Sequence, residues 1–340
     1  SHALEIWQYI KEHDNGVTNF HFEIGADLLT QKEIELIRTM RPGLIQLEIG
    51  VQSTNKKTLR EIRRYAPFEK IAANVLAVNE GGNIHQHLDL IAGLPWEDYE
   101  SFRKSFNEVY ALSPNQLQLG FLKVLKGSYM HEKAQDYGCV YKDREPYEVL
   151  GTRWLSYQDI IRLKSVEEMT EIYYNSGQFS RTIQAAVQEF PEPFSFYEAL
   201  GKFYEEKGYD TLSHSRIRRY EILLEFLETA GSSCLEFYRQ LMVYDLYARE
   251  NMKTRPSWAP ERKAYKDKIQ AFYEREKEGP RYLSGYREYS SRQMEKMTHL
   301  EIFSWNVAEG KKEEGIYPVL FDYQKRSPLT WDAADFLVEV

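Results

Sequence analysis

The stretch HLDLIAGLPWED (residues 87–98) decides the fold of this sequence. Its first half alternates in polarity, so Leu88 and Leu90 share one face of a strand and Asp89 lies on the other. A Gly-Leu-Pro step follows, and because glycine and proline interrupt regular structure, the strand ends near Gly93. The pattern predicts a half-polar strand with a rigid exit, which is suited to holding a ligand.

Strand patterns of this kind recur through the first 125 residues. Strand patterns alternate with helical patterns, and the strands fall at residues 17–24, 44–51, 83–93 and 117–125. The helix after the first strand starts with Thr30 and Glu33, whose spacing is that of a capping box. Strands and helices that alternate in this way indicate parallel βαβ units. We therefore expect an α/β fold with a parallel sheet.

Each of these strands has one apolar face and one polar face. Strands that helices cover on both faces are usually apolar throughout, so a doubly wound sheet fits poorly. The pattern favours a partial (β/α) barrel with helices outside and a polar ligand in the lumen. In such barrels the site lies at the carboxyl ends of the strands, where Glu23, Gln52 and Glu97 fall. A complete barrel takes about 250 residues, so we expect further strands ahead of residue 17 in the natural protein.

The chain changes character after the fourth strand pattern. Residues 1–130 make up the expected half-barrel, and residues 131–296 carry the periodicity of a mostly helical domain. Residues 297–340 contain two alternating segments, HLEIFSWNV and GIYPVLFDYQK. We expect these segments to form a small terminal β-hairpin that packs on the helical domain. Much of the aromatic content lies in the second half, where we expect it to pack helices.

Composition narrows the classes of function. The chain carries 44 basic and 52 acidic side chains, and its net charge of -8 disfavours general nucleic-acid binding. The sequence contains no run of about 18 apolar residues, so it predicts no membrane-spanning helix. No signal-peptide pattern opens the chain, so we expect a cytoplasmic protein. The two cysteines, Cys139 and Cys234, lie far apart in the sequence and do not make a cysteine-rich metal site.

Four motifs in a fixed order carry a family resemblance: FHFEIGADLLTQKEIELI, LEIGVQSTNKKTLREIRR, HLDLIAGLPWEDYESFRKSF and LKVLKGSYM. This order resembles the later half of a radical S-adenosylmethionine (SAM) barrel. It is most similar to the cobalamin-binding-domain class, including the magnesium-protoporphyrin ester oxidative cyclase-like branch. Members of that branch carry a C-terminal helical domain of unknown function, which residues 131–340 resemble. The resemblance implies an oxidoreductase or methyltransferase that uses radical chemistry on a small-molecule substrate.

The resemblance also implies SAM contacts at the strand ends. Glu23 matches a polar residue that helps to hold the amino-acid moiety of SAM. Gln52 matches a residue that hydrogen-bonds the ribose, with Ser53 beside it. Arg64 matches an arginine that pairs with the SAM carboxylate, and a guanidinium fork suits that group.

The implied adenine contacts fall on the third and fourth strands. Ile91 matches a residue that packs on adenine, and Gly93 matches one that lets the backbone approach. Leu122 begins the stretch whose backbone borders the adenine, and Glu97 closes the motif at the rim of the pocket. An apolar strand edge with accessible backbone suits a flat base.

The sequence departs from the family at its cluster motif. The family signature Cys-x3-Cys-x2-Cys binds a [4Fe–4S] cluster through thiolates, and this sequence lacks it. We therefore expect a fragment whose upstream cluster-binding and cobalamin domains belong to the same full-length protein. That parent would use SAM, the cluster and cobalamin, whereas the fragment by itself should bind no cofactor and be inactive. A half-barrel has open strand edges, so we also expect that the fragment can pair with a second copy.

Two alternatives stay open at this point. One is a different barrel enzyme, in which His85, His87 and Asp89, together with Glu97, form a metal-assisted hydrolytic site, since imidazoles and carboxylates are common metal ligands. The other is a non-catalytic binding module, in which residues 131–340 dock a partner and the half-barrel is scaffold.

Overall fold

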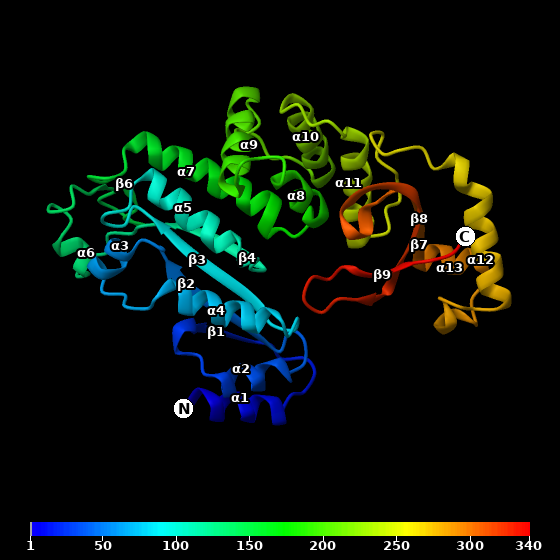
Figure 1. The fold of residues 1–340 in the computed structure, drawn as a ribbon, viewed down its shortest axis with the longest axis horizontal. Coiled ribbons are helices and arrows are strands. Elements are labelled where there is room, and N and C mark those ends of the chain that lie inside the picture. The colour runs from blue at the N-terminus through cyan, green and yellow to red at the C-terminus, as the bar shows by residue number, and fades with distance from the viewer. Residues whose placement is uncertain (1) are drawn as a thin grey trace. The chain divides into compact units, whose positions relative to one another are not determined.

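The computed structural model describes residues 2–340, which divide into two units (Figure 1). The N-terminal unit holds residues 2–175 and 192–202. The C-terminal unit holds residues 176–191 and 203–340. The expected boundary at residue 130 therefore falls inside the N-terminal unit, and the contacts of the segment after β4 give the reason.

A four-stranded parallel sheet forms the centre of the N-terminal unit. Its strands lie side by side in chain order, as β1 (Phe20–Ile24), β2 (Ile45–Gln52), β3 (His85–Ala92) and β4 (Gln116–Phe121). The α/β class, the parallel pairing and the number of strands predicted from the sequence are confirmed. Figure 1 shows the four strands as a run from blue to cyan.

The helices of this unit follow the strands. They are α1 (His2–Glu12), η1 (Ala26–Leu28), α2 (Gln31–Arg38), α3 (Lys56–Glu61), α4 (Phe68–Asn79) and α5 (Tyr99–Tyr110). The predicted capping box is present at the start of α2, where Thr30 and Glu33 exchange hydrogen bonds. Leu88 and Leu90 are fully buried on the face of the sheet that they share with Gln86. The Gln86 amide donates to the carbonyl of Val75 in α4, so this face lies against helices.

The segment after β4 folds back onto the sheet. It contains α6 (Tyr129–Glu132), β5 (Val140–Tyr141), β6 (Val149–Gly151), α7 (Tyr157–Thr170) and the π-helical turn η2 (Glu171–Asn175). The backbone N–H of Val149 donates to Leu122, and that of Val124 donates to Tyr147. The Asn175 side chain pairs with both backbone groups of Leu117. These bonds attach the segment to β4, which is why the unit extends to Asn175.

The C-terminal unit combines helices with an antiparallel sheet. Its helices and helical turns are α8 (Ser180–Val187), α10 (Arg216–Thr229), α11 (Leu235–Arg249), η3 (Lys263–Tyr265), α12 (Lys266–Glu278), η4 (Ser284–Tyr286), α13 (Ser291–Met297) and η5 (Val307–Glu309). Helix α9 (Pro193–Lys207) contributes residues to both units. Aromatic side chains fill the core as expected, and Tyr220 and Tyr238 are fully buried.

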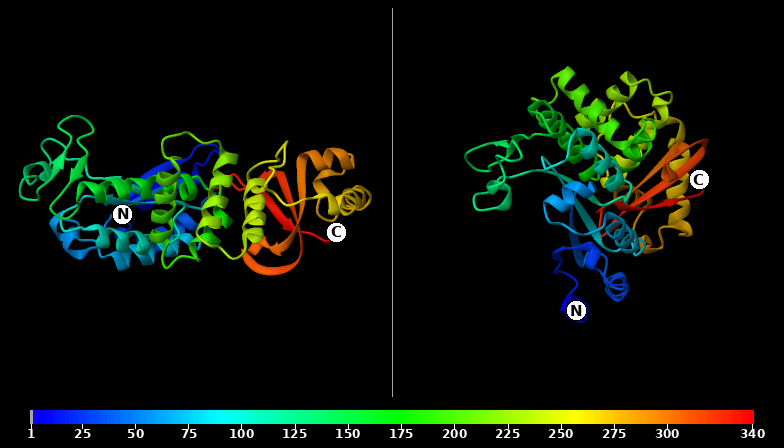
Figure 2. Two further views of the ribbon diagram at one scale, coloured as in Figure 1. Left: turned by 90° about the horizontal axis from the view of Figure 1, so that it is seen from above. Right: turned by 60° about the vertical axis from the view of Figure 1, so that its left-hand side comes forward.

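The terminal sheet has one strand more than the predicted hairpin. Strands β7 (Thr298–Asn306) and β8 (Lys311–Arg326) form the expected antiparallel pair, and β9 (Ala333–Leu337) adds to β8. Figure 2 shows β7 and β8 as a long curved ribbon beside α11. Helix α11 packs on this sheet, because the ring of Tyr244 contacts Phe303 and Phe321.

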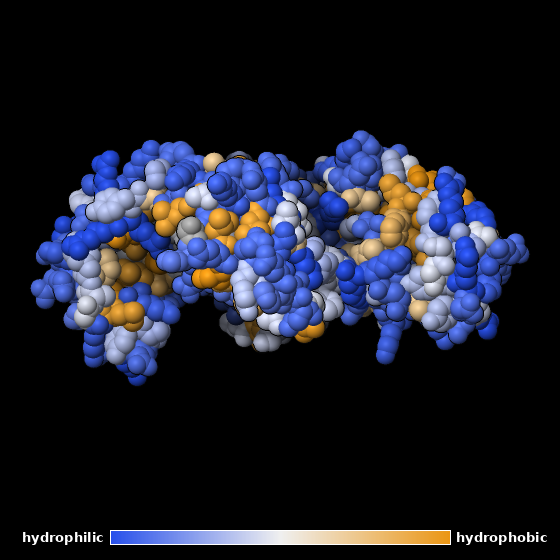
Figure 3. Space-filling view, turned by 90° about the horizontal axis from the view of Figure 1, so that it is seen from below, coloured by the Kyte–Doolittle hydropathy of each residue, from blue (hydrophilic) through white to orange (hydrophobic). Residues whose placement is uncertain are grey.

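The surface is mostly polar with separate apolar areas (Figure 3). In helix α1, Trp7 and Ile10 are buried while Ile6 and Tyr9 are exposed. Within residues 2–340, no helix combines the length and the apolar character needed to cross a membrane.

Candidate functional site

The polar face of the parallel sheet gathers titratable side chains from three neighbouring strands. Glu23 of β1, Glu48 of β2 and His87 of β3 share one row of the strand register. Asp89 lies one step further along the same face of β3. The imidazole Nε2 of His21 lies 2.8 Å from Oε2 of Glu48, and Nε2 of His87 lies 3.1 Å from Oδ1 of Asp89. The alternation seen in the sequence thus produces a continuous polar surface.

This surface perturbs the acidity of its members. The pKa of Asp89 is raised to about 7. Burial is the largest cause, and the nearby carboxylates of Glu48 and Glu23 act in the same direction. Burial lowers the pKa of His87 and of His85. Asp89 therefore keeps its proton to a higher pH than an ordinary aspartate does.

The end of β2 brings two predicted residues together above a glycine. Gln52 has a φ of 68°, in the left-handed region that is unfavourable for a residue with a side chain, and β2 bulges between Gly50 and Gln52. A β-carbon at Gly50 would collide with Nε2 of Gln52 and would lie 3.3 Å from Nη2 of Arg64. Because Gly50 has no side chain, the amide of Gln52 and the guanidinium of Arg64 can both lie over its backbone.

The end of β3 presents a small apolar area on the same face. Ile91 is half-buried, and its register partner on β4 is Gly120. A β-carbon at Gly120 would lie 3.7 Å from Cγ1 of Ile91, so the glycine leaves the isoleucine side chain uncovered on that side. Glu23 is exposed near the end of β1. Among the predicted residues, Glu23, Gln52, Arg64 and Ile91 thus lie at the carboxyl ends of the strands.

Ser53 and Glu97 are also brought together, but inside the protein. Glu97 is 0% exposed, where the resemblance implied a position at the rim. Its carboxylate accepts hydrogen bonds from Ser105 at 3.0 Å and Ser101 at 3.3 Å, and Ser53 is a further partner. Burial raises the pKa of Glu97 to about 7 despite these hydroxyls. Three hydroxyls from two segments, the end of β2 and helix α5, converge on this carboxyl, so Glu97 anchors the loop after β3.

Gly93 and Leu122 are covered by the chain itself. Gly93 has a φ of 92°, and a β-carbon there would lie 2.8 Å from Cγ1 of the buried Val149. The carbonyl of Leu122 accepts from the N–H of Val149, and the N–H of Leu122 donates to Ala92. The resemblance implied that a ligand approaches the backbone at Gly93. In the structure the side chain of Val149 in β6 occupies that position.

Glu48 is a member of the site that was not among the residues predicted from the sequence. Its position opposite Leu47 marked it as polar, but only the register places it between His21 and Asp89. The signal available was the unbroken polar face of three successive strands, of which we selected only the end residues.

The described residues do not fit a metal or a [4Fe–4S] cluster. Across residues 2–340, no group of three or more His, Cys, Asp or Glu side chains is arranged to hold a metal ion, so His85, His87 and Asp89 do not form such a group. Cys139 and Cys234 are both free thiols, in different units. A cluster needs three or four thiolates, so this chain does not provide its ligands.

A second candidate lies within the C-terminal unit, in a cavity of about 590 Å³. Arg181, Arg326, Asp245 and Asp332 are among its charged lining residues. Asp245 is buried and accepts from the backbone N–H groups of Arg181 and Thr182 at 2.9 Å, so it caps helix α8. Burial raises the pKa of Asp245 to about 6.

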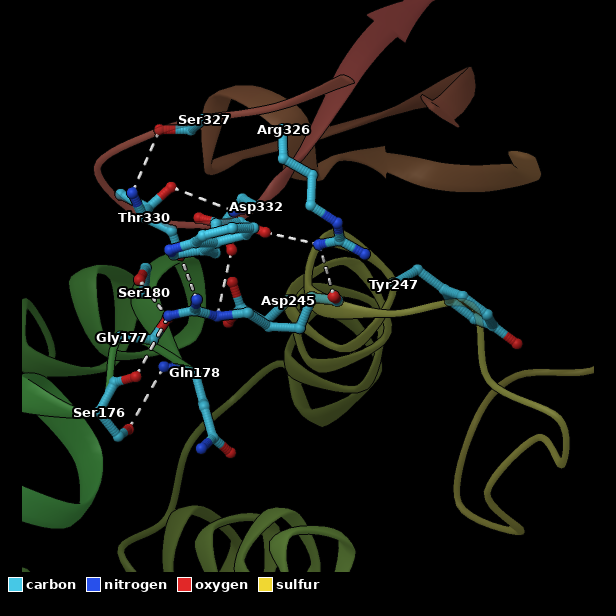
Figure 4. A network of polar contacts seen from close by, with 12 residues as sticks. Ser176, Gly177, Gln178, Ser180, Asp245, Tyr247, Arg326, Ser327, Thr330 and Asp332 are labelled. Carbon is cyan, nitrogen blue, oxygen red and sulfur yellow. Dashed lines mark hydrogen bonds and ion pairs between the residues drawn. The ribbon is translucent and has the colours of Figure 1, made fainter. Parts of the chain in front are cut away.

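An arginine beside that cavity ties three segments of the C-terminal unit. Arg249 donates to the carbonyls of Ser176 and Thr330, and its Nε lies 3.1 Å from Asp332. Figure 4 shows the start of α8, helix α11 and the loop after β8 meeting at this point. The polar groups around the cavity bind one another, so their arrangement serves the fold of this unit.

The N-terminal unit is thus an α/β structure with a four-stranded parallel sheet, and the chain shows distant, partial similarity to radical SAM enzymes. It is 34% identical over 107 residues to oxygen-independent coproporphyrinogen III oxidase of Salmonella typhimurium, covering 30% of this chain and 23% of that protein. It is 25% identical over 167 residues to the coproporphyrinogen-III oxidase-like protein HemZ of Bacillus subtilis, covering 39% and 33%. The chain spans a quarter to a third of the length of these relatives.

A solved structure is similar over a comparable share. Coproporphyrinogen III oxidase (HemN) from Escherichia coli, described as a radical SAM enzyme, is 20% identical, with 49% of this chain and 36% of that chain covered at a TM-score of 0.37. A protein-family model matches residues 135–321, which is more than half of the chain. The chain belongs to the family described as "Protein of unknown function (DUF4080)".

Proposed function

We propose that this chain supplies the SAM-contacting half of a radical SAM enzyme that acts on a small-molecule substrate. The observation that carries the proposal is the arrangement of Gln52 and Arg64 over Gly50. A polar side chain in a left-handed conformation is unfavourable, and such conformations cluster at binding sites. The distant relatives named above support the reaction class, because one of them is described as a radical SAM enzyme.

The residues at the strand ends match the chemical groups of SAM in the proposed role. The Gln52 amide would hydrogen-bond a ribose hydroxyl, and the Arg64 guanidinium would pair with the carboxylate. The uncovered side of Ile91, beside Gly120, would receive the adenine ring. Glu23 would accept from the ammonium group. When bound, SAM supplies radical or methyl-transfer chemistry, and these residues orient it.

The predicted residues that are buried would not contact SAM. Their proposed role is to position the residues that do. Glu97 and Ser53 fix the loop after β3, so their proposed role is to hold the site in shape rather than to touch SAM. Gly93 and Leu122 would define its wall through their contacts with Val149. The proposal requires cysteines from outside these 340 residues for the cluster, and a cobalamin domain for the cobalamin-dependent class.

The outer edge of β1 supports one further part of the proposal. Within residues 2–340, β1 pairs only with β2. An unpaired edge is a template for another strand, so the proposed complement is either more of the same barrel or a second copy of this chain. Sedimentation at several concentrations distinguishes them, since only a second copy produces concentration-dependent association of the 340-residue chain.

The test of the proposed function is SAM cleavage. The natural gene product that carries these residues is reconstituted under anaerobic conditions with iron and sulfide. We expect about four irons per chain, as one cluster requires, and SAM cleavage that depends on a reductant. Gln52→Ala should retain the iron and lose most of the cleavage. A fully reconstituted protein that leaves SAM intact would exclude the proposal.

A further inference from the structure

A row of polar side chains crosses the sheet below the residues assigned to SAM. His21 pairs with Glu48, the carboxyl of Glu48 hydrogen-bonds that of Asp89, and Asp89 lies 3.1 Å from His87. The side chain of Gln118 on β4 hydrogen-bonds the imidazole of His87. The row therefore links all four strands on the polar face.

The charge of this row is not balanced by the protein. Glu48 and Asp89 pair with histidines alone, and no lysine or arginine of the described chain forms an ion pair with either carboxylate. Arg64 lies above Gly50, the register neighbour of Asp89, yet forms no ion pair in the part of the chain described. When both are ionised, these two carboxylates repel each other in a partly buried setting, because no cation of the described chain pairs with them.

Buried polar atoms in the row have no hydrogen-bond partner. Nε2 of His87 and Oδ1 of Asp89 are shielded from solvent and unpaired in hydrogen-bonding geometry, although they face each other. The His87 side chain is only 9% exposed. Nε2 of His85 is unpaired as well. Buried polar atoms are nearly always hydrogen-bonded, so these exceptions call for an explanation, and a ligand bound at this face would be one.

We propose that Glu48, Asp89 and His87 form a subsite for the protonated nitrogen of a substrate, in an amine or a guanidinium group. The N–H groups of such a cation would donate to Oδ1 of Asp89 and to Nε2 of His87, in the imidazole tautomer that leaves this nitrogen unprotonated. The positive charge would offset the repulsion between Glu48 and Asp89. The assignment rests on the proposed function in one respect: it treats the ligand as the substrate of the SAM site.

The experiment uses the natural gene product that carries these residues, labelled with ¹⁵N-histidine. The probe is 1,4-diaminobutane, and 1,4-butanediol at equal ionic strength is its neutral counterpart. We expect saturable shifts of the His87 ring nitrogens with the diamine and none with the diol. Asp89→Asn should weaken diamine binding at least tenfold, and Glu48→Gln should do the same if Asp89→Asn does not fold. Asp136→Asn, an exposed carboxylate paired with Lys133, should bind like the wild type.

Three results would overturn the assignment: no shift in the wild type, equal shifts with diamine and diol, or unchanged affinity in both carboxyl variants. S-adenosylhomocysteine binding, measured on the same samples, keeps the two proposals apart. Gln52→Ala should reduce the binding of that nucleoside and leave diamine binding intact. Diamine binding without any nucleoside binding would retain the subsite and remove the cofactor site.

Discussion

The hydroxyl of Ser105 donates a 3.0 Å hydrogen bond to the carboxylate of Glu97, a side chain with no exposure to solvent. Ser105 lies on helix α5, whereas Glu97 belongs to the loop that leaves β3. Asn55 makes the corresponding tie from the β2 side, because its amide donates to the carbonyl of Trp96 at 2.8 Å and to Ser101 at 2.9 Å. The ends of β2 and β3 are thus held at a fixed distance, which positions the strand-end residues.

The pKa of Glu97 predicts a pH dependence of stability. Burial raises this pKa to about 7 from 4.5, so the folded chain binds the proton more tightly than the unfolded chain. Stability from this group is therefore greatest below about pH 4.5 and is lost as pH rises to about 7, by up to about 3 kcal/mol. Glu97→Gln should remove this part of the slope, as measured by urea unfolding at pH 5 and pH 8.

Two comparisons check that interpretation of Glu97. Glu97→Ala should cost about 3 kcal/mol, because it leaves buried serine hydroxyls without an acceptor. Glu100→Gln, at an exposed site in the first turn of helix α5, should change neither the stability nor its slope. A Glu97→Gln protein that keeps the full pH slope would show that the pKa of Glu97 is not raised.

Gly50→Ala should disrupt the proposed cofactor site without unfolding the sheet. Alanine is tolerated in strands, but its β-carbon would displace the side chains of Gln52 and Arg64. We expect at least tenfold weaker S-adenosylhomocysteine binding, with an unchanged far-ultraviolet circular dichroism spectrum. Gly285→Ala, where a β-carbon meets open space, is the matched control. Equal affinity in both variants would contradict the role of Gly50.

Asn175→Ala should loosen the free edge of β4. The Asn175 side chain satisfies the N–H of Leu117 at 2.9 Å and its carbonyl at 3.0 Å, and Leu117 is fully buried. Loss of both bonds leaves backbone groups unpaired, at a cost of about 2 kcal/mol. Hydrogen exchange at the Leu117 amide should accelerate by about thirtyfold, in proportion to that cost. Unchanged protection of this amide would contradict the capping role.

Asp245→Ala should destabilise helix α8. The carboxylate accepts from two backbone N–H groups and from the hydroxyl of Thr182 at 2.7 Å. Removal of a helix cap costs about 1–2 kcal/mol, and the buried donors left behind add to this. Thermal unfolding should show a lower midpoint for Asp245→Ala than for Asp210→Ala, which replaces an exposed aspartate. Equal midpoints would mean that Asp245 does not stabilise the helix.

The parallel sheet was predictable because its signals are local. Alternation in β2 and β3 set the buried face, and the start of α2 carried its own cap in Thr30 and Glu33. The polar face could be predicted as well, since it follows from the same two-residue period. What the pattern did not provide was the register that brings Glu48 to Asp89.

The features that the sequence did not reveal depend on contacts between distant segments. Val149 contacts Gly93 and Leu122 from a segment that lies later in the chain. No local sequence pattern could therefore predict these contacts. Glu97 followed a strand end like a site residue, yet it is buried because serines from other segments surround it. Strand β9 was missed because its sequence, AADFL, has no β-branched residue and contains alanine and aspartate, which are depleted in strands.

A SAM site at the ends of these strands is tested by the affinity of the natural gene product for S-adenosylhomocysteine, compared with the affinity of Gln52→Ala. If Gln52 contacts the ribose, the variant should bind at least tenfold more weakly, which corresponds to about 1.4 kcal/mol. Its circular dichroism spectrum and unfolding midpoint should match those of the wild type. An affinity in Gln52→Ala equal to that of the wild type would contradict the assignment of a SAM site to the ends of these strands.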